Sequence, residues 1–229
     1  MMLLRAPGVY TPQHDTLLLV EALHAAAIPA GARVLDIGTG TGALALAAMR
    51  SGASEVTAVD ISHRAVWTAR INAALRRLPV RVRRGDVLDV VGDETFDLVL
   101  ANPPYVPARS AARGPARAWD AGPEGRELLN PLCARMFDLL APGGVLLMVH
   151  SGLCGVDRTL RQLRGSGLKA AVVKRRWVPF GPVLRSRAAF LEAHGLIEPG
   201  QRDEELVVIR GDRAVPAQGD DRDERPDAG

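Results

Sequence analysis

Apolar segments along the chain alternate with segments of helical periodicity. Short apolar runs, typical of buried strands, occupy residues 32–38, 54–61, 80–87, 96–103, 144–151, 168–177 and 204–211. Residues 42–52 and 62–78 have the spacing of helices, and Ser62 stands where an N-cap is expected. Strands that alternate with helices predict a parallel α/β sheet covered by helices on both faces.

The run at 80–87 differs from the others because basic residues interrupt it. Arg81, Arg83 and Arg84 stand among its valines, whereas no basic residue interrupts 34–38 or 97–101. Charged side chains suit an edge strand, where unpaired backbone groups would otherwise attract other chains. We therefore expect this strand at a border of the sheet.

The length of the chain allows one sizeable core. Its 229 residues are 47% hydrophobic and 24% charged, which is typical of a globular protein. We predict a single domain over 1–211. Residues 212–229 are polar and poor in aromatic side chains, and they include six acidic and three basic residues, so we predict a disordered acidic tail.

Several classes of protein are disfavoured by the composition. No apolar run is long enough to span a membrane, and the first ten residues lack the long apolar region of a signal peptide. Cys133 and Cys154 have neither disulfide-framework nor zinc-site spacing. We therefore expect a cytoplasmic protein with reduced thiols and no metal.

The charge balance gives a weak indication of partners. Without the tail, the chain has 26 basic and 20 acidic residues. Such a surface suits an anionic partner such as RNA or a ribosome-bound factor. The basic residues are almost all arginine in a chain rich in alanine and glycine, and a GC-rich genome produces the same bias whatever the function.

A glycine-rich turn follows the first strand. Gly38, Gly40 and Gly42 permit a tight turn and a close approach of a ligand at the mouth of the next helix. The spacing is GxGxG, whereas dinucleotide enzymes usually have GxGxxG. Asp36 precedes the turn; it would repel a pyrophosphate but attract an ammonium group. This combination favours S-adenosylmethionine (SAM) as the ligand.

Two further acids agree with this interpretation. Asp60 ends the second strand, where a carboxylate can accept hydrogen bonds from ribose hydroxyls. Asp86 follows the third strand, where it and the backbone of Val87 can meet the adenine edge. Each acid alone is more often a helix cap or a solvated turn. Three acids at successive strand ends beside GxGxG predict a SAM site, to which we also assign Ile61.

The fourth strand ends in Asn102, Pro103, Pro104 and Tyr105, which we predict to be the catalytic residues. The Asn102 side-chain oxygen and the Pro103 carbonyl are two acceptors held in fixed relation, because proline restricts φ. They match the two donors of a planar NH2 group, on which Tyr105 can stack. Such a nitrogen is a poor nucleophile, and the two acceptors would stabilise the positive charge that develops during methyl transfer.

The order of "VLDIGTGTG", "AVD" and "LANPPY" resembles the class I SAM-dependent methyltransferases, and most closely the HemK-type release-factor glutamine methyltransferases. Residues 8–23 and 119–144 extend the resemblance, which covers 8–211. It implies a seven-stranded Rossmann-like sheet whose last strand is antiparallel. It also implies that residues 1–30 cover the cofactor, that Thr16 and Asn102 lie beside it, and that the substrate is a glutamine of a class 1 release factor.

The sequence departs from the bacterial members of that family in two places. They carry an N-terminal helical bundle, whereas few residues precede Tyr10 here. This short form looks more like the eukaryotic and archaeal branch, in which a small zinc-binding activator pairs with the sheet edge. The arginines of the third strand make a poor apolar surface, so we do not expect an obligate activator. The second departure is the segment 183–203, for which we suggest only a substrate lid.

Three other functions remain open on the sequence alone. The same acceptor pair fits the amino group of adenine in DNA or RNA, although little chain is left for a target-recognition domain. The 183–203 segment keeps a small-molecule methyltransferase of specialised metabolism in view. A non-catalytic SAM-binding module is a third candidate, and the intact NPPY motif argues against it.

Overall fold

The computed structural model describes residues 3–26, 28–109 and 114–216. Its elements are, in chain order, α1 (His14–Ala25), β1 (Arg33–Ile37), α2 (Ala43–Arg50), β2 (Glu55–Asp60), α3 (His63–Ala74), β3 (Val80–Arg84), α4 (Val87–Val91), β4 (Phe96–Ala101), η1 (Gly114–Ala118), α5 (Leu129–Leu139), β5 (Leu140–Ser151), η2 (Gly152–Cys154), α6 (Val156–Gly165), β6 (Lys169–Pro179), α7 (Pro182–Ala193) and β7 (Asp203–Asp212). Each of the seven predicted strands is present. Ser62 caps α3 as expected, because its side chain accepts a hydrogen bond from the Ala65 N–H.

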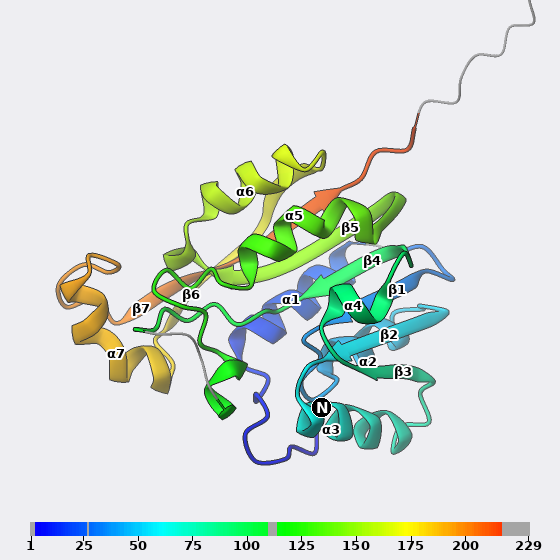
Figure 1. Ribbon diagram of the computed structural model, residues 1–229, viewed down its shortest axis with the longest axis horizontal. Helices are drawn as coiled ribbons and strands as arrows, with labels where there is room; N and C mark the ends of the chain where they lie inside the picture. The colour runs from blue at the N-terminus through cyan, green and yellow to red at the C-terminus, as the bar shows by residue number, and fades with distance from the viewer. Residues whose placement is uncertain (1–2, 27, 110–113, 217–229) are drawn as a thin grey trace, which may run out of the picture.

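The seven strands form one sheet in the order β3-β2-β1-β4-β5-β7-β6, as Figure 1 shows. Pairing is parallel from β3 to β5, and β7 runs antiparallel to both of its neighbours. The predicted Rossmann-like sheet with an antiparallel last strand is therefore confirmed, and so is the edge position of β3. The third strand is shorter than its apolar run, because β3 ends at Arg84 and Val87 already begins α4.

Helices cover both faces of the sheet, and the alternation of side chains along each strand assigns residues to the two faces. Val34 of β1 belongs to the core on the side of α1, α2 and α3. Its neighbour Leu35 belongs to the core on the side of α5 and α6. A strand that is buried on both faces needs a nearly continuous apolar run, and this explains why the runs were visible in the sequence.

The segment between the last two strands contains α7 and packs at one end of the sheet (Figure 1). It has a small apolar cluster of its own, formed by Val106, Phe180, Leu184, Ala188, Leu191 and Ile197. Val106 lies just beyond the end of β4, in the loop that follows the Asn-Pro-Pro-Tyr motif. The segment is therefore attached directly to that loop.

Regular structure extends slightly beyond the predicted domain end at residue 211. Asp212 is the last residue of β7, and the Arg213 guanidinium lies 4.1 Å from the centre of the Phe137 ring. The rest of the predicted tail, from 217 onward, lies outside the described residues. Among the helices that are described, none has the length and apolarity required to cross a membrane.

Candidate active site

The loops that follow β1, β2, β3 and β4 lie at one edge of the sheet, because these four strands are parallel neighbours. Hydrogen bonds join the first two of these loops and tie the fourth to α1. The Gly40 N–H donates to Asp60 Oδ2 at 2.9 Å, which ties the glycine turn to the end of β2. Asn102 Nδ2 donates to Thr16 Oγ1 at 3.2 Å, which ties the end of β4 to α1. The structure thus brings together predicted residues from four separate parts of the chain.

The three glycines of the turn have different surroundings. All have positive φ: +68° at Gly38, +53° at Gly40 and +84° at Gly42. A Cβ added to Gly38 would have no atom within 4 Å, so open space adjoins the turn at that point. A Cβ on Gly42 would lie 3.3 Å from both Cα and Cβ of Ala69. Gly38 therefore leaves room for a ligand, whereas Gly42 allows the start of α2 to approach α3.

Asp36 is fully buried beneath this turn. Its Oδ2 accepts hydrogen bonds from the Thr39 hydroxyl at 2.6 Å and from the Ala45 N–H at 3.1 Å. Its Oδ1 has no hydrogen-bond partner among the described residues. Burial raises the pKa of Asp36 to about 7, although the two hydrogen bonds act in the opposite direction. A buried carboxylate oxygen without a partner is costly, and a cationic group bound at the open turn would satisfy it.

The other two predicted acids lie at the ends of β2 and β3. Asp60 Oδ1 accepts the Ser62 N–H at 2.8 Å, and burial raises the pKa of Asp60 against its two backbone hydrogen bonds. Asp86 is exposed and caps α4, because its Oδ1 accepts the Leu88 N–H at 3.0 Å. Each carboxylate is held by backbone donors and retains lone pairs for a further donor. Ile61, in the loop after β2, has 50% of its surface exposed.

The Asn-Pro-Pro-Tyr loop is half-buried and is fixed at both of its ends. Asn102 is held by Thr16, and the Tyr105 carbonyl accepts a hydrogen bond from the Cys154 thiol, with a sulfur–oxygen distance of 3.1 Å. A Cβ on Gly125 would lie only 2.3 Å from that carbonyl oxygen, so the backbone at 125 needs glycine to pass it. The loop therefore has little freedom to move relative to the sheet.

The Tyr105 side chain is directed into the protein more than the sequence suggested. Its hydroxyl donates to Asp15 Oδ2 at 3.1 Å, and the Tyr10 hydroxyl donates to the same oxygen at 2.7 Å. Desolvation and the charge of Asp15 raise the pKa of both phenols far above the usual value, so both remain donors. The ring also packs against all three apolar clusters. Tyr105 thus anchors its loop, whatever its contact with a substrate.

Sequence reasoning missed two buried acids beside this loop, Asp15 and Glu204. Asp15 is 3% exposed and Glu204 is 6% exposed. Burial raises the pKa of Glu204 to about 7, a hydrogen bond with the Ser151 side chain opposes this shift, and the charge of Asp15 adds to it. The strand register contained a signal for Glu204, since it alternates with the core residues Leu206 and Val208. The burial of Asp15 had no comparable signal in the sequence.

Comparison with known proteins agrees with this geometry. A family model described as the methyltransferase small domain matches residues 1–175. A putative protein N5-glutamine methyltransferase of Methanocaldococcus jannaschii is 33% identical over 177 residues, covering 76% of this chain and 88% of the relative. The release factor glutamine methyltransferase of Deinococcus radiodurans is 42% identical over 124 residues, which are 51% of this chain and 44% of that protein. Against the latter, the chain spans less than half of the relative's length.

Solved structures share the fold. The Mtq2–Trm112 complex of E. cuniculi, described as responsible for methylation of the eRF1 translation termination factor, aligns with a TM-score of 0.63 at 24% identity, covering 90% of this chain and 99% of that one. The T. thermophilus 16S rRNA N2 G1207 methyltransferase aligns with a TM-score of 0.61 at 22% identity, covering 91% of this chain and 46% of that one. The family model and the M. jannaschii relative each match about three quarters of this chain. The chain therefore belongs to the methyltransferase small-domain family and is a SAM-dependent methyltransferase.

Proposed function

We propose that this protein methylates the side-chain nitrogen of a glutamine in a protein, and that the protein is a class 1 peptide-chain release factor. Names of the similar proteins from M. jannaschii and D. radiodurans support this assignment. The observation that carries it is the position of the Asn102–Tyr105 loop, at the carboxyl end of β4 and next to the glycine turn of β1. An acceptor pair for a planar NH2 group then stands beside the cofactor site. Such a substrate implies a location in the cytoplasm.

For the cofactor, the proposed contacts follow the four loops. Asp36 Oδ1, which lacks a partner among the described residues, faces the ammonium group, and Gly38 and Gly40 let the ligand approach the backbone. Asp60 accepts the ribose hydroxyls. The remaining contacts of the adenine ring are assigned to Ile61, Asp86 and Val87, from the loops after β2 and β3. We place residues 3–13 beside the glycine turn, within the proposed single domain of 1–211. Asn72 Nδ2 donates to the Leu4 carbonyl at 2.8 Å and to the Thr41 carbonyl at 3.0 Å, which links this segment to the turn.

In the proposed mechanism, SAM supplies a methyl group made electrophilic by the sulfonium. The chain's own residues prepare the nitrogen. Asn102 Oδ1 and the Pro103 carbonyl accept the two N–H donors, which fixes the plane of the amide and stabilises positive charge on nitrogen as it develops. Holding nitrogen and methyl carbon in line removes most of the entropic cost of the encounter. The amide proton is lost during or after the transfer.

The experiment incubates the purified chain with methyl-labelled SAM and a release factor, followed by mass-spectrometric mapping of the labelled atom. We expect label on the glutamine of the Gly-Gly-Gln motif. A release factor with Gln→Glu at that position is the matched control and should remain unlabelled. Label found only on nucleic acid or on a small metabolite would refute the proposed substrate. In a second arm, Asn102→Ala should abolish transfer with SAM affinity nearly unchanged, and a retained activity would exclude the catalytic role of Asn102.

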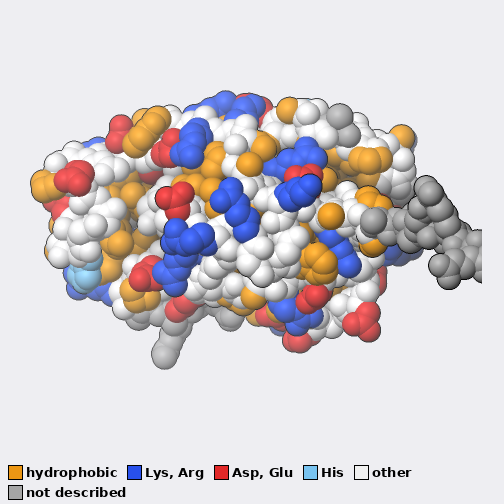
Figure 2. Space-filling model, turned by 90° about the horizontal axis from the view of Figure 1, so that it is seen from above, with side chains coloured by type: hydrophobic (Ala, Val, Ile, Leu, Met, Phe, Trp, Pro, Cys, Tyr) orange, Lys and Arg blue, Asp and Glu red, His pale blue; other side chains and the backbone are white. Residues whose placement is uncertain are grey.

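Adenine in nucleic acid is the main competing acceptor. On the face shown in Figure 2, Lys and Arg side chains are scattered and acidic groups stand among them, without one continuous basic tract. Nucleic-acid enzymes usually concentrate their positive charge along a groove or stripe. The surface in that view therefore gives no specific support to nucleic-acid binding, and protein glutamine is the better proposal.

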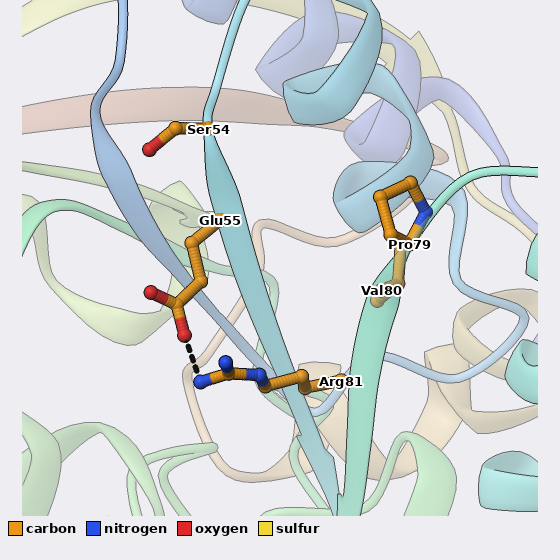
Figure 3. Close-up of a pocket in the computed structure, with 5 residues that line it drawn as sticks. All are labelled: Ser54, Glu55, Pro79, Val80 and Arg81. Carbon is orange, nitrogen blue, oxygen red and sulfur yellow. Dashed lines mark hydrogen bonds and ion pairs between the residues drawn. The ribbon is translucent and has the colours of Figure 1, made fainter.

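We further propose that the chain acts without an obligate activator subunit. Edge strand β3 carries charged pairs: Arg81 contacts Glu55 and Arg83 contacts Glu94. Figure 3 shows the first pair in a hollow at the amino ends of β2 and β3, lined also by Ser54, Pro79 and Val80. The surface formed by α3 and the residue that follows it is more apolar, since Trp67 and Leu75 are 54% and 66% exposed. Purification alone is the test: a chain that is insoluble or inactive until a small partner is co-expressed would refute this proposal.

A further inference from the structure

A short chain of hydrogen bonds connects the buried Asp15 to the proposed catalytic Asn102. Asp15 Oδ1 lies 3.2 Å from the Thr16 hydroxyl, and that hydroxyl lies 3.2 Å from Asn102 Nδ2. The same carboxylate accepts the Thr16 N–H at 2.5 Å and, through Oδ2, the hydroxyl of Tyr105. Asp15 and Thr16 thus contact both ends of the Asn-Pro-Pro-Tyr loop, although 86 residues separate Thr16 from Asn102.

The direction of each hydrogen bond follows from the chemistry of the three side chains. A carboxylate can only accept, so the single proton of the Thr16 hydroxyl points to Asp15. The Thr16 hydroxyl oxygen then acts towards Asn102 only as an acceptor, so Asn102 must supply an N–H donor. The NH2 end of the Asn102 amide is therefore turned to Thr16, and its oxygen is turned away from α1.

We propose that Asp15 and Thr16 are positioning residues that fix the Asn102 amide with its oxygen directed at the acceptor nitrogen. This inference rests on the proposed function. A flipped amide would set NH2 against the NH2 of the substrate, which places donor against donor. It would also aim the positive end of the amide dipole at the nitrogen on which positive charge develops. One reversed side chain would therefore oppose the reaction without any change in the cofactor site.

The surroundings of Asp15 suit this role. It lies in the first turn of the 12-residue helix α1, where the N-terminal end of the helix dipole favours a negative charge. Two tyrosine hydroxyls and a backbone N–H supply further donors, so the carboxylate is buried at 3% exposure without an unmet charge. Tyr10 also ties the segment before α1 to the same oxygen as Tyr105. A rigid, desolvated acceptor of this kind holds one arrangement of the Thr16 proton.

The test compares Thr16→Val with Thr16→Ser. Valine has nearly the shape of threonine but no hydroxyl, whereas serine retains it. We expect Thr16→Val to lower kcat by about tenfold to a hundredfold at saturating SAM, with little change in the dissociation constant of SAM. Direct loss of an oriented transition-state group typically costs about a hundredfold to a thousandfold, and Thr16 acts only through Asn102. Thr16→Ser should retain most of the wild-type kcat. Thr68→Val removes another buried hydroxyl, which donates to the Arg64 carbonyl, and is the control for general destabilisation.

A second readout is independent of the acceptor. The side-chain NH2 resonances of Asn102, identified by their loss in Asn102→Ala, should exchange slowly with water in the wild type and in Thr16→Ser. They should exchange quickly in Thr16→Val. If the wild type does not label glutamine, the proposed substrate fails, and this exchange measurement alone decides the inference.

Three results from kinetics and binding would overturn the positioning role. The first is a wild-type kcat in Thr16→Val, and the second is equal loss in the valine and serine variants. The third is a weakened SAM affinity with kcat intact at saturation, which would make Thr16 a cofactor contact as the sequence suggested. Slow exchange of the Asn102 amide in Thr16→Val would contradict it equally.

Discussion

The affinity of this protein for SAM should depend on pH through Asp36. The proposed ammonium contact requires the charged carboxylate, and burial raises the pKa of Asp36 to about 7 in the unliganded protein. As pH falls through that value the carboxylate gains a proton, and the attraction is lost. The charged fraction is about one half at pH 7, about one eleventh at pH 6 and about 1% at pH 5. The apparent dissociation constant should therefore rise about fivefold from pH 7 to 6 and about ninefold more from pH 6 to 5.

Isothermal titration calorimetry of SAM binding between pH 5 and 7 measures this slope. The free α-amino group of SAM remains mostly protonated in that range, since ordinary α-amino pKa values lie near 8. Binding should also release protons, which is detected by comparing buffers of different ionisation enthalpy. Asp36→Asn should bind more weakly and with a smaller slope, since Asp60 in the same site also has a raised pKa. Glu204→Gln is the control, because Glu204 also has a pKa raised to about 7 but is one of the two buried acids beside the Asn-Pro-Pro-Tyr loop.

Protonation of Asp36 does not itself unfold the protein, because its linkage to stability has the opposite sign. A carboxyl group whose pKa is raised on folding contributes stability that is complete below its unfolded value and is lost as pH rises through the folded value. For Asp36 the unliganded protein should therefore become more stable as pH falls from about 7 to 4. A dissociation constant that stays constant from pH 5 to 7, or an equal slope in Asp36→Asn, would refute the ammonium contact.

Three further outcomes follow from the same structure. Gly42→Ala should lower the melting temperature more than Gly38→Ala. Alanine at either position must adopt a positive φ, which costs about 1–2 kcal/mol, but only at position 42 does the added Cβ also crowd Ala69 of α3. Gly38→Ala should chiefly weaken SAM binding. Arg187→Met should lower the free energy of unfolding, measured by urea denaturation, by about 1–3 kcal/mol. The substitution leaves the largely buried carboxylate of Asp120 without its ion-pair partner. Glu204→Gln should gain stability relative to wild type as pH rises from about 4 to 7 in thermal melts, because it removes the stability loss linked to the raised pKa of Glu204.

The sheet could be predicted because its signal is repeated along each strand. β1, β2 and β4 are five to six residues long, and most of their positions are buried between helices on both faces, so the pattern is local and nearly continuous. The acids at the strand ends were predictable for a related reason. Once the strands are parallel neighbours, Asp36 and Asp60 must lie at the same edge, whatever the details of packing.

The hydrogen-bonded group around Asp15 could not be predicted, because its members come from distant parts of the chain. An acid in the first turn of a helix, such as Asp15, usually indicates only an interaction with the helix dipole. Its burial depends on Tyr105, which is 90 residues away and reaches Asp15 only after β4 has been placed next to β1. The same holds for Thr16, whose bond to Asn102 exists only in the folded sheet.

The segment around α7 is better understood as a fixed wall than as a lid. Phe180, Leu184 and Leu191 are each at most 3% exposed, and exposing one such side chain costs about 1.5–3 kcal/mol. Arg187 adds a hydrogen bond to the Pro107 carbonyl at 3.0 Å, which ties α7 to the loop after the Asn-Pro-Pro-Tyr motif. Opening would break these contacts together, at a cost of several kcal/mol. Under the proposed mechanism, such a wall would restrict by its shape which acceptor reaches Asn102, and the chemistry of methyl transfer would remain at the sheet edge.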